Sequence, residues 1–383
     1  MNKIKEYKKL GSFKNIKLDN SDDGKLVISR IKKIFDNQSF SKKLSKYQLN
    51  IINLVKSELF EKEEPIFKLS NYVIEEIKTI SDDQVLNYLF HRYRYEVHPE
   101  KNQLDSYPPY LQIEPSSICN YRCVFCFETD KTFTNKKSGH MGTMNLDLFK
   151  NIIDRAHGKV EFLSLASRGE PLVSKAINEM LKYTEGKFLN LKLNTNASLL
   201  NEEKIHSILS GGVKTLVFSA DAADEKLYAE LRVNGSLKNI LKNINLFNTI
   251  KEKKYPKSKI ITRVSGVKVN KDQDFDQMNN FWGELVNQVA FVDYNPWENV
   301  YLSEANEITK PCSDLWRRMF IWWDGKINPC DTDYKSNLSP GNIKDFDFDL
   351  NKAWNSDSYA RLRNFHLNKN RKELKPCQSC VVT

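Results

Sequence analysis

The sequence lacks the features that would place it in a membrane or direct it to export. None of its apolar runs, over 383 residues, approaches the roughly 18 residues that a membrane-spanning helix needs. Its first residues are mostly polar and basic, without the apolar segment of a secretory signal. We therefore expect a cytoplasmic protein with no membrane partner.

Basic residues exceed acidic ones, yet no basic stripe is interleaved with aromatic side chains. The formal net charge is +10, with blocks of like charge such as residues 251–254 and 369–372. A groove-reading or base-stacking surface would need aromatic and basic residues together on one element. We predict no nucleic-acid partner and interpret the blocks as solvated surface. An anionic substrate, such as a nucleotide-linked sugar or an acidic peptide, is the alternative use of this charge.

Cysteines are few, and their number is odd. There are seven, which argues against a closed framework of disulfides. They divide into three that lie close together, at Cys119, Cys123 and Cys126, and four later ones. The later cysteines are Cys312, Cys330, Cys377 and Cys380. Thiolates are soft ligands that suit iron–sulfur clusters and zinc, so the division predicts one open and one closed metal site.

The first hundred residues have no cysteine and show helical spacing of apolar residues. The pattern covers residues 26–35, 44–60, 73–80 and 85–95. We predict a helical extension over residues 1–106 that stabilises the fold, with a module that binds substrate or partner as the alternative. A Pro-Pro pair at Pro108 marks the start of the next region.

Strand and helix patterns alternate from there to about residue 304, which is typical of parallel βα units. The strands are expected at Tyr110 to Glu114, Val160 to Ala166, Phe188 to Asn194, Thr215 to Ser219, Ile260 to Val269 and Val289 to Tyr294. The helices are expected at Leu146 to Ala156, Ala176 to Tyr183, Glu202 to Leu209, Lys226 to Arg232, Leu237 to Ile250 and Phe275 to Val286. Six strands are too few for a closed eight-stranded barrel.

The last region, residues 305–383, contains the four later cysteines. An apolar run from Met319, an Asp-Gly turn and a second short strand predict a β-hairpin that ends at Cys330. A helix is expected from Trp354 to Phe365, and a C-x2-C pair follows near the end. Such a set of four thiolates suits zinc and a [4Fe–4S] cluster equally well.

The early cysteines have the spacing C-x3-C-x2-C and follow the first strand directly. Structural zinc sites use four ligands, usually in C-x2-C pairs, whereas three thiolates satisfy three irons of a cubane and leave one iron open. The stretch from Cys119 to Cys126 resembles the cluster loop of the radical S-adenosylmethionine (SAM) superfamily. Half of a zinc site remains the alternative.

The resemblance implies an α/β fold, an open (βα)6 partial barrel over residues 107–304. It also implies that SAM chelates the open iron, and that one electron splits SAM into methionine and a 5′-deoxyadenosyl radical, which abstracts a substrate hydrogen atom. A low-potential donor such as flavodoxin or ferredoxin would supply the electron.

Further motifs match the SAM site of this superfamily. Gly169, Glu170 and the following proline form a "GEP" motif after the second strand, which the resemblance assigns to the methionine amino group. Ser219 and Arg232 match its ribose and carboxylate contacts. Phe125 is expected against the adenine and Asn194 as a weaker ligand. Ala197 replaces a glycine that the family tends to have, which leaves that loop's shape open.

The late cysteines resemble the "twitch" form of the SPASM auxiliary domain, a small α+β domain that binds one extra [4Fe–4S] cluster. Four protein thiolates would leave no open iron there, so the cluster would relay an electron and permit a net oxidation.

Three functions remain open. The first is oxidation or epimerisation of a sugar or aminocyclitol. The second is maturation of a peptide or protein by crosslinking or residue oxidation. The third and most remote is a non-catalytic zinc protein. Catalytic residues are unassigned, with four candidates for orienting or deprotonating the substrate: Arg263, Asp293, Tyr294 and Glu298.

Overall fold

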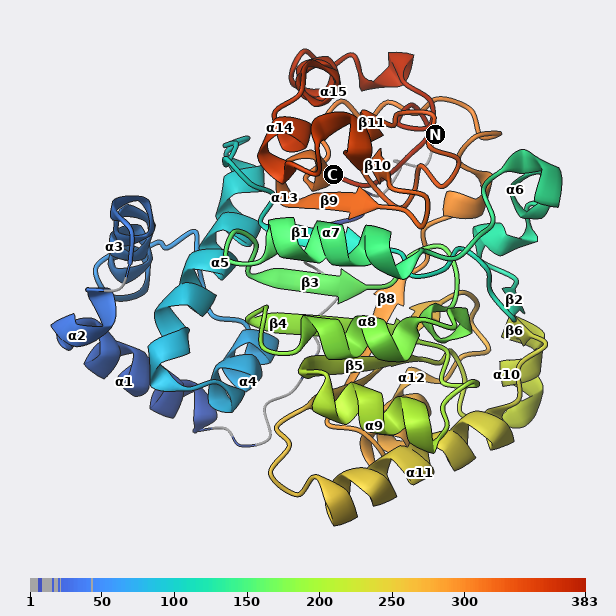
Figure 1. The fold of residues 1–383 in the computed structure, drawn as a ribbon, viewed down its shortest axis with the longest axis horizontal. Helices are drawn as coiled ribbons and strands as arrows, with labels where there is room; N and C mark the ends of the chain where they lie inside the picture. The colour runs from blue at the N-terminus through green and yellow to red at the C-terminus, as the bar shows by residue number, and fades with distance from the viewer. Residues whose placement is uncertain (1–5, 9–15, 17–19, 21, 43) are drawn as a thin grey trace.

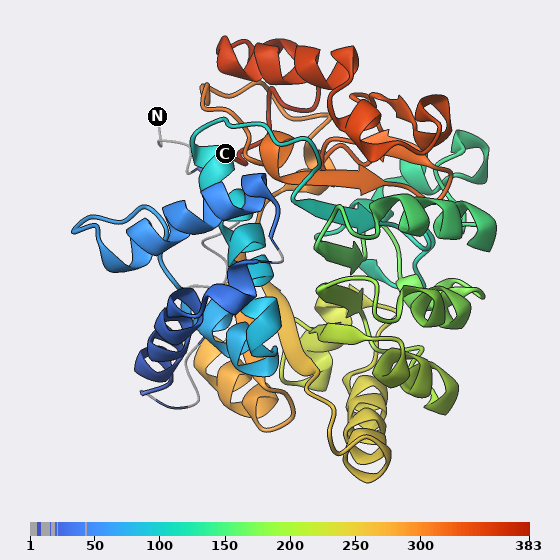
Figure 2. The same ribbon diagram turned by 60° about the vertical axis from the view of Figure 1, so that its left-hand side comes forward.

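A computed structural model describes residues 6–8, 16, 20, 22–42 and 44–383. Helices α7 (Leu146–Ala156), α8 (Ile177–Thr184) and α9 (Glu202–Ser210) lie along one side of a central sheet, and the first helices lie at the end where the strands begin (Figures 1 and 2). The C-terminal region lies along one edge of the sheet, at the top of Figure 1.

The six strands expected from the sequence all form and run parallel. They are β1 (Tyr110–Ile113), β3 (Phe162–Leu165), β4 (Asn190–Thr195), β5 (Val213–Ser219), β7 (Ile261–Lys268) and β8 (Gln288–Asp293). Each strand pairs with the next one in this series, as expected for consecutive right-handed βα units. The mixed α/β fold with a central parallel sheet is therefore confirmed.

The sheet continues into the C-terminal region, which the sequence did not indicate. Strand β9 (Arg318–Ile321) pairs in parallel with β1, so the predicted hairpin extends the barrel sheet. Its second strand is β10 (Lys326–Asn328), and β11 (Gly341–Asn342) follows at the edge. The end of β10 lies close before Cys330, as predicted.

The two faces of the sheet differ in polarity because side chains alternate along each strand. Leu111, Leu163, Leu191 and Leu216 are buried in the main core beneath the helices. These helices are α7 (Leu146–Ala156), α8 (Ile177–Thr184), α9 (Glu202–Ser210), α10 (Glu225–Leu231), α11 (Leu237–Lys254) and α12 (Phe275–Gly283). The alternate positions face the barrel interior and include polar residues such as Lys192.

The N-terminal helices form a second apolar core that also covers the start of the strands. They are α1 (Asp23–Asp36), α2 (Gln38–Ser41), α3 (Lys46–Phe60), α4 (Asn71–Thr79) and α5 (Asp82–Glu100). Tyr110 and Phe162, the first residues of β1 and β3, belong to this core. Arg94 of α5 binds Asp105 at 2.9 Å and Glu161 at 3.0 Å. The predicted helical extension is therefore present and is packed onto the barrel.

One predicted helix is interrupted. Instead of running from Trp354 to Phe365, the chain forms α14 (Leu350–Trp354) and α15 (Asp357–Leu367). The predicted helix is present as α15 but starts three residues later, because Ser356 is the N-cap of α15 and its hydroxyl accepts a hydrogen bond from the backbone amide of Tyr359. A short α13 (Asp314–Arg317) precedes β9.

Candidate active site and the two groups of cysteines

The loop with the first three cysteines leaves the C-terminal end of β1 and is held on three sides. Its strand β2 (Arg122–Cys123) pairs with β6 (Arg232–Val233). The side chain of Asn120 accepts from Asn196 and donates to Ser198, both at 2.9 Å. The indole of Trp297 donates to the carbonyl of Phe125 at 2.8 Å. Strand ends and later loops therefore fix the loop jointly.

The three thiols of this loop share one apolar cluster and suppress one another's ionisation. Tyr121, Phe125 and Leu231 complete the cluster. Burial raises the pKa of Cys119 to about 12, and burial with the nearby Cys123 and Cys119 raises the pKa of Cys126 well above its usual value. Buried thiols become thiolates when a metal centre supplies the compensating charge. The donor set therefore fits an iron–sulfur cluster.

In the described part of the chain, no group of three or more His, Cys, Asp or Glu side chains is arranged to hold one metal ion. A cubane binds each cysteine through a different iron. Its ligands therefore do not need to converge on a single point.

Gly169 of the GEP motif packs against the backbone that leads into the cluster loop. A Cβ atom on Gly169 would lie 2.5 Å from the backbone carbon of Ser117 and 2.6 Å from the carbonyl oxygen of Ile118. Only glycine allows so close an approach of two backbones. Gly169 therefore lets the turn after β3 contact the chain that leads into Cys119.

Glu170 is buried and links the ends of β3 and β4. Its carboxylate accepts hydrogen bonds from the Thr195 hydroxyl and the Asn196 amide, both at 2.7 Å, and from the Leu172 amide at 3.1 Å. Burial raises its pKa, and these donors offset part of the rise. The described contacts make Glu170 a positioning residue, and its contact with SAM stays a prediction.

Arg232 lies beside the cluster loop in an ion pair. Its Nε is 2.6 Å from a carboxylate oxygen of Asp221, and its Nη1 is 3.9 Å from the sulfur of Cys123. Its guanidinium also lies 5.9 Å from the centre of the Phe125 ring. Ser219 is the last residue of β5. Their roles as ligands of SAM stay predictions.

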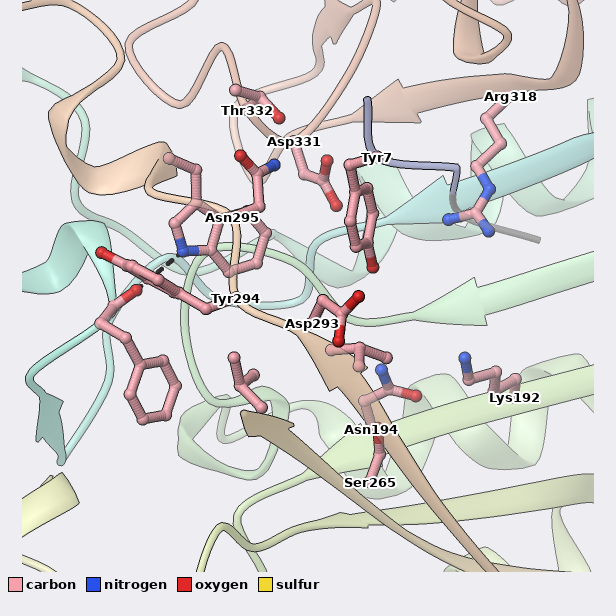
Figure 3. Close-up of a pocket in the computed structure, with 14 residues that line it drawn as sticks. Tyr7, Lys192, Asn194, Ser265, Asp293, Tyr294, Asn295, Arg318, Asp331 and Thr332 are labelled. Atoms are coloured by element: carbon pink, nitrogen blue, oxygen red, sulfur yellow. Dashed lines mark hydrogen bonds between the residues drawn. The ribbon is translucent and has the colours of Figure 1, made fainter. Parts of the chain in front are cut away.

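The loop after β4 keeps a left-handed conformation without its glycine. Ala197 has a φ of 62°, which costs a non-glycine residue roughly 1–2 kcal/mol. The amide of Asn243 donates to the carbonyls of Ala197 at 2.9 Å and Ser198 at 3.1 Å, which holds the turn. Asn194, at the end of β4, points toward the pocket described next (Figure 3).

A pocket of about 220 Å³ opens at the C-terminal edge of the strands. Phe125 and Trp297, joined by a hydrogen bond, line it, as do Asp331 and the following threonine, directly after Cys330. Figure 3 shows Asp331 and Thr332. The pocket thus lies between the two groups of cysteines. Of the four candidates for substrate contact, Asp293 and Tyr294 line it, Arg263 lines a smaller cavity deeper in the barrel, and Glu298 accepts from the Tyr294 hydroxyl.

The four later cysteines come together in the C-terminal region. Cys312 and Cys380 belong to one apolar cluster. Burial raises the pKa of Cys377 well above its usual value, and the neighbouring Cys380 and Cys312 raise it further. Burial also raises the pKa of Cys330. The set of four mutually close thiols, two of them buried and two partly buried, fits a closed [4Fe–4S] site.

A buried arginine holds the backbone around these cysteines. Arg371 is 1% exposed and donates to the carbonyls of Cys380 at 2.8 Å, Lys310 at 2.9 Å and Val382 at 3.1 Å, and also to that of Cys377. One side chain therefore joins the segments that carry Cys312, Cys377 and Cys380.

Sequence reasoning missed the residues that connect the barrel to this region. Arg168, just before Gly169, binds both carboxylate oxygens of Glu114, at 2.8 and 2.6 Å, and donates to the carbonyl of Tyr334 at 2.8 Å. It also missed Lys192 and Arg318 in the pocket. The alternation of β4 placed Lys192 on the interior face, which was a usable signal.

Two family models match the chain. The Radical SAM superfamily matches residues 113–281, and SPASM, an iron–sulfur cluster-binding domain, matches residues 312–381. Together they cover well over half of the chain and imply SAM and two [4Fe–4S] clusters. None of the described helices is long and apolar enough to cross a membrane.

The chain is also similar to individual proteins. It is 25% identical to GTP 3′,8-cyclase of Clostridium botulinum (strain Okra / Type B1) over 220 residues, which are 54% of this chain and 64% of that relative, just under two thirds of its length.

Among solved structures, Streptococcus suis SuiB bound to precursor peptide SuiA has a TM-score of 0.54 and 18% identity, covering 90% of this chain and 82% of that one. BtrN in complex with AdoMet and 2-DOIA has a TM-score of 0.48 and 15% identity, covering 71% and 92%. By the two family models, the chain belongs to the radical SAM superfamily and carries a SPASM-type domain at residues 312–381.

Proposed function

We propose that the protein oxidises or epimerises a compact polar molecule, of the sugar or aminocyclitol type, bound between its two cluster sites. The observation that supports this is the position of the pocket, which has Phe125 of the SAM-cluster loop on one wall and Asp331, next to Cys330, on another. When bound, SAM and its cluster supply a 5′-deoxyadenosyl radical that abstracts a hydrogen atom, and the auxiliary cluster can accept an electron.

The protein's own groups bind and orient the substrate in this proposal. Asp293, the last residue of β8, presents its carboxylate to the pocket, and Tyr294 lines the pocket while its hydroxyl donates to Glu298. Such groups can hold hydroxyl or amino substituents of a sugar by hydrogen bonds. The pocket volume of about 220 Å³ favours a compact substrate.

A low-potential flavodoxin or ferredoxin is the proposed electron donor, in the cytoplasm. The match of residues 312–381 to the SPASM domain favours the cluster over zinc at the late cysteines, and iron and sulfide analysis after anaerobic purification tests this. About eight irons per chain are expected from two cubanes. Stoichiometric zinc at the late cysteines would remove the oxidation from the proposal.

Peptide maturation is the second candidate, because SuiB, whose fold this chain shares over 90% of its length, was solved with a precursor peptide. The identity of the neighbouring genes guides which substrates to test. Neighbouring sugar or glycan genes favour the first candidate, and a neighbouring precursor-peptide gene favours the second. Each deuterated candidate is then incubated with reduced protein and SAM. Deuterium in 5′-deoxyadenosine from a sugar or cyclitol supports the first candidate, and deuterium only from a peptide refutes it.

A further inference from the structure

Lys192 is an interior lysine that faces a cavity without a partner. It lies in the middle of β4, on the interior face, and lines both the substrate pocket and the smaller cavity of about 70 Å³ beneath it. Among the described residues its ammonium group has no hydrogen-bond or ion-pair partner. Holding an unpaired ammonium in the protein interior costs free energy. An anion bound beside Lys192 would offset this cost.

Arg318 stands beside it with an incomplete set of partners. Its guanidinium lines the same two cavities and donates from Nε to the hydroxyl of Tyr95 at 2.9 Å. The guanidinium carries five N–H donors. Its Nη2 donates to the same hydroxyl, and among the described residues Arg318 has no other hydrogen-bond acceptor. Donors therefore remain for a ligand.

Polar atoms without partners surround the two cations. The side-chain oxygens of Asn190 and Thr215 are buried around the deeper cavity, and that of Asn194 lies at the pocket; in the described part of the chain none of the three has a hydrogen bond. Thr215 can donate its hydroxyl, and the amides can present their NH2 groups. These donors add to the two cations at the same end of the pocket.

Cations outnumber anions at this end. Arg263 of β7 lines the deeper cavity and donates to the amide oxygen of Gln288 at 2.9 and 2.6 Å. Glu76 of α4 is the acidic group facing that cavity, and it accepts from Tyr88. Asp293 and Asp331 face the upper pocket. Burial, then Arg263 and Arg318, lower the pKa of Lys192 to about 7, and Glu76 opposes this.

We propose that Lys192 and Arg318 form an anion-binding subsite at the inner end of the substrate pocket, and that the substrate is a small polar molecule with one carboxylate or phosphate group. Figure 3 shows both cationic side chains on the side of the pocket away from Tyr294, and Phe125 of the cluster loop lines the same pocket. An anion held there directs the rest of the molecule toward the cluster loop. The proposal rests on the proposed function in taking this cavity as the substrate pocket.

Isothermal titration of the anaerobic holoprotein with SAM tests the subsite without turnover. Inorganic phosphate and acetate are the two probes, each at constant ionic strength with chloride. We expect one probe to bind at one site per chain, and the probe that binds identifies the source of the anion. Lys192→Met and Lys192→Gln should weaken that binding at least about tenfold, because each removes the cation.

Two variants serve as controls. Lys192→Arg keeps the charge and should bind within about threefold of the parent. Lys253→Met removes an exposed lysine of α11 and should leave binding unchanged. Iron content and circular dichroism establish that each variant is folded.

The proposal is overturned if the parent binds neither probe, if both neutral variants bind as the parent does, or if Lys253→Met weakens binding equally. SAM cleavage in the same preparations separates the two hypotheses. If the neutral Lys192 variants lose anion binding but still transfer hydrogen from the substrate to 5′-deoxyadenosine as the parent does, the subsite alone is refuted. Intact binding without hydrogen transfer from any small acid refutes the proposed function alone.

Discussion

Single residues of the site do work that their motifs only partly reveal. The glycine and carboxylate of the GEP motif were predicted as contacts of SAM, and the structure shows them bracing the protein. Gly169 allows two backbones to touch, and the Glu170 carboxylate joins the ends of β3 and β4. A sequence motif reports that a residue is required at a place, but its hydrogen bonds come from elements far along the chain.

Gly169→Ala should reduce the yield of the first cluster. The added Cβ would meet backbone atoms at 2.5–2.6 Å, which no side-chain movement can relieve. We expect the iron content to fall by about four per chain and 5′-deoxyadenosine production from SAM to fall at least tenfold. Gly283→Ala is the matched control, since its Cβ meets nothing within 4 Å. Equal iron and activity in the two variants would contradict the role given to Gly169.

Lys192→Met should stabilise the protein, and more so at pH 7 than at pH 9. The pKa of Lys192 is lowered to about 7 in the fold, so between pH 7 and its unfolded value near 10.4 the unfolded chain binds more protons. Stability of the parent therefore rises with pH across this window. The advantage of the variant should shrink by roughly 2 kcal/mol from pH 7 to pH 9. Urea unfolding at the two pH values measures it, and a pH-independent difference would show an unperturbed lysine.

At the scale of elements, the periodicity of apolar residues correctly predicted those strands and helices that depend on consecutive residues. The alternation of leucines in β4 and the helical spacing of α7 are read from consecutive residues, and both elements formed as expected. The pairing of β9 with β1 was not predictable, because it joins residues about 200 positions apart through backbone hydrogen bonds that any sequence can make. The break between α14 and α15 depends on Ser356, a capping signal that the apolar pattern hid.

The C-terminal cysteine loops depend on one arginine, so Arg371→Met should lose the second cluster selectively. The change leaves buried carbonyls of several segments without a donor, including those of Cys377 and Cys380. Iron should fall from about eight to about four per chain, with SAM cleavage retained. Arg361→Met, on the exposed face of α15, is the control. Full iron content in Arg371→Met would contradict this account.

At the scale of the whole molecule, the second apolar core joins the N-terminal helices to the first residues of β1 and β3. Arg317 of α13 donates to the carbonyl of Tyr95 in α5 at 3.0 Å, and Tyr110 and Phe162 of the sheet lie among the helical side chains. The chain 107–383 alone should therefore aggregate, because it would expose this surface to water. Size-exclusion chromatography after anaerobic expression checks it. A monodisperse 107–383 chain with full iron would show that the helices are dispensable for folding.

The account depends most directly on an iron with no protein ligand in the loop of Cys119, Cys123 and Cys126. The deciding measurement is the amount of 5′-deoxyadenosine and methionine that the anaerobically reconstituted protein forms from SAM with a low-potential reductant. The account predicts both products from the parent and from a Cys330→Ala control, and neither from the variant in which all three loop cysteines are alanine. Continued cleavage of SAM by that triple variant would contradict it.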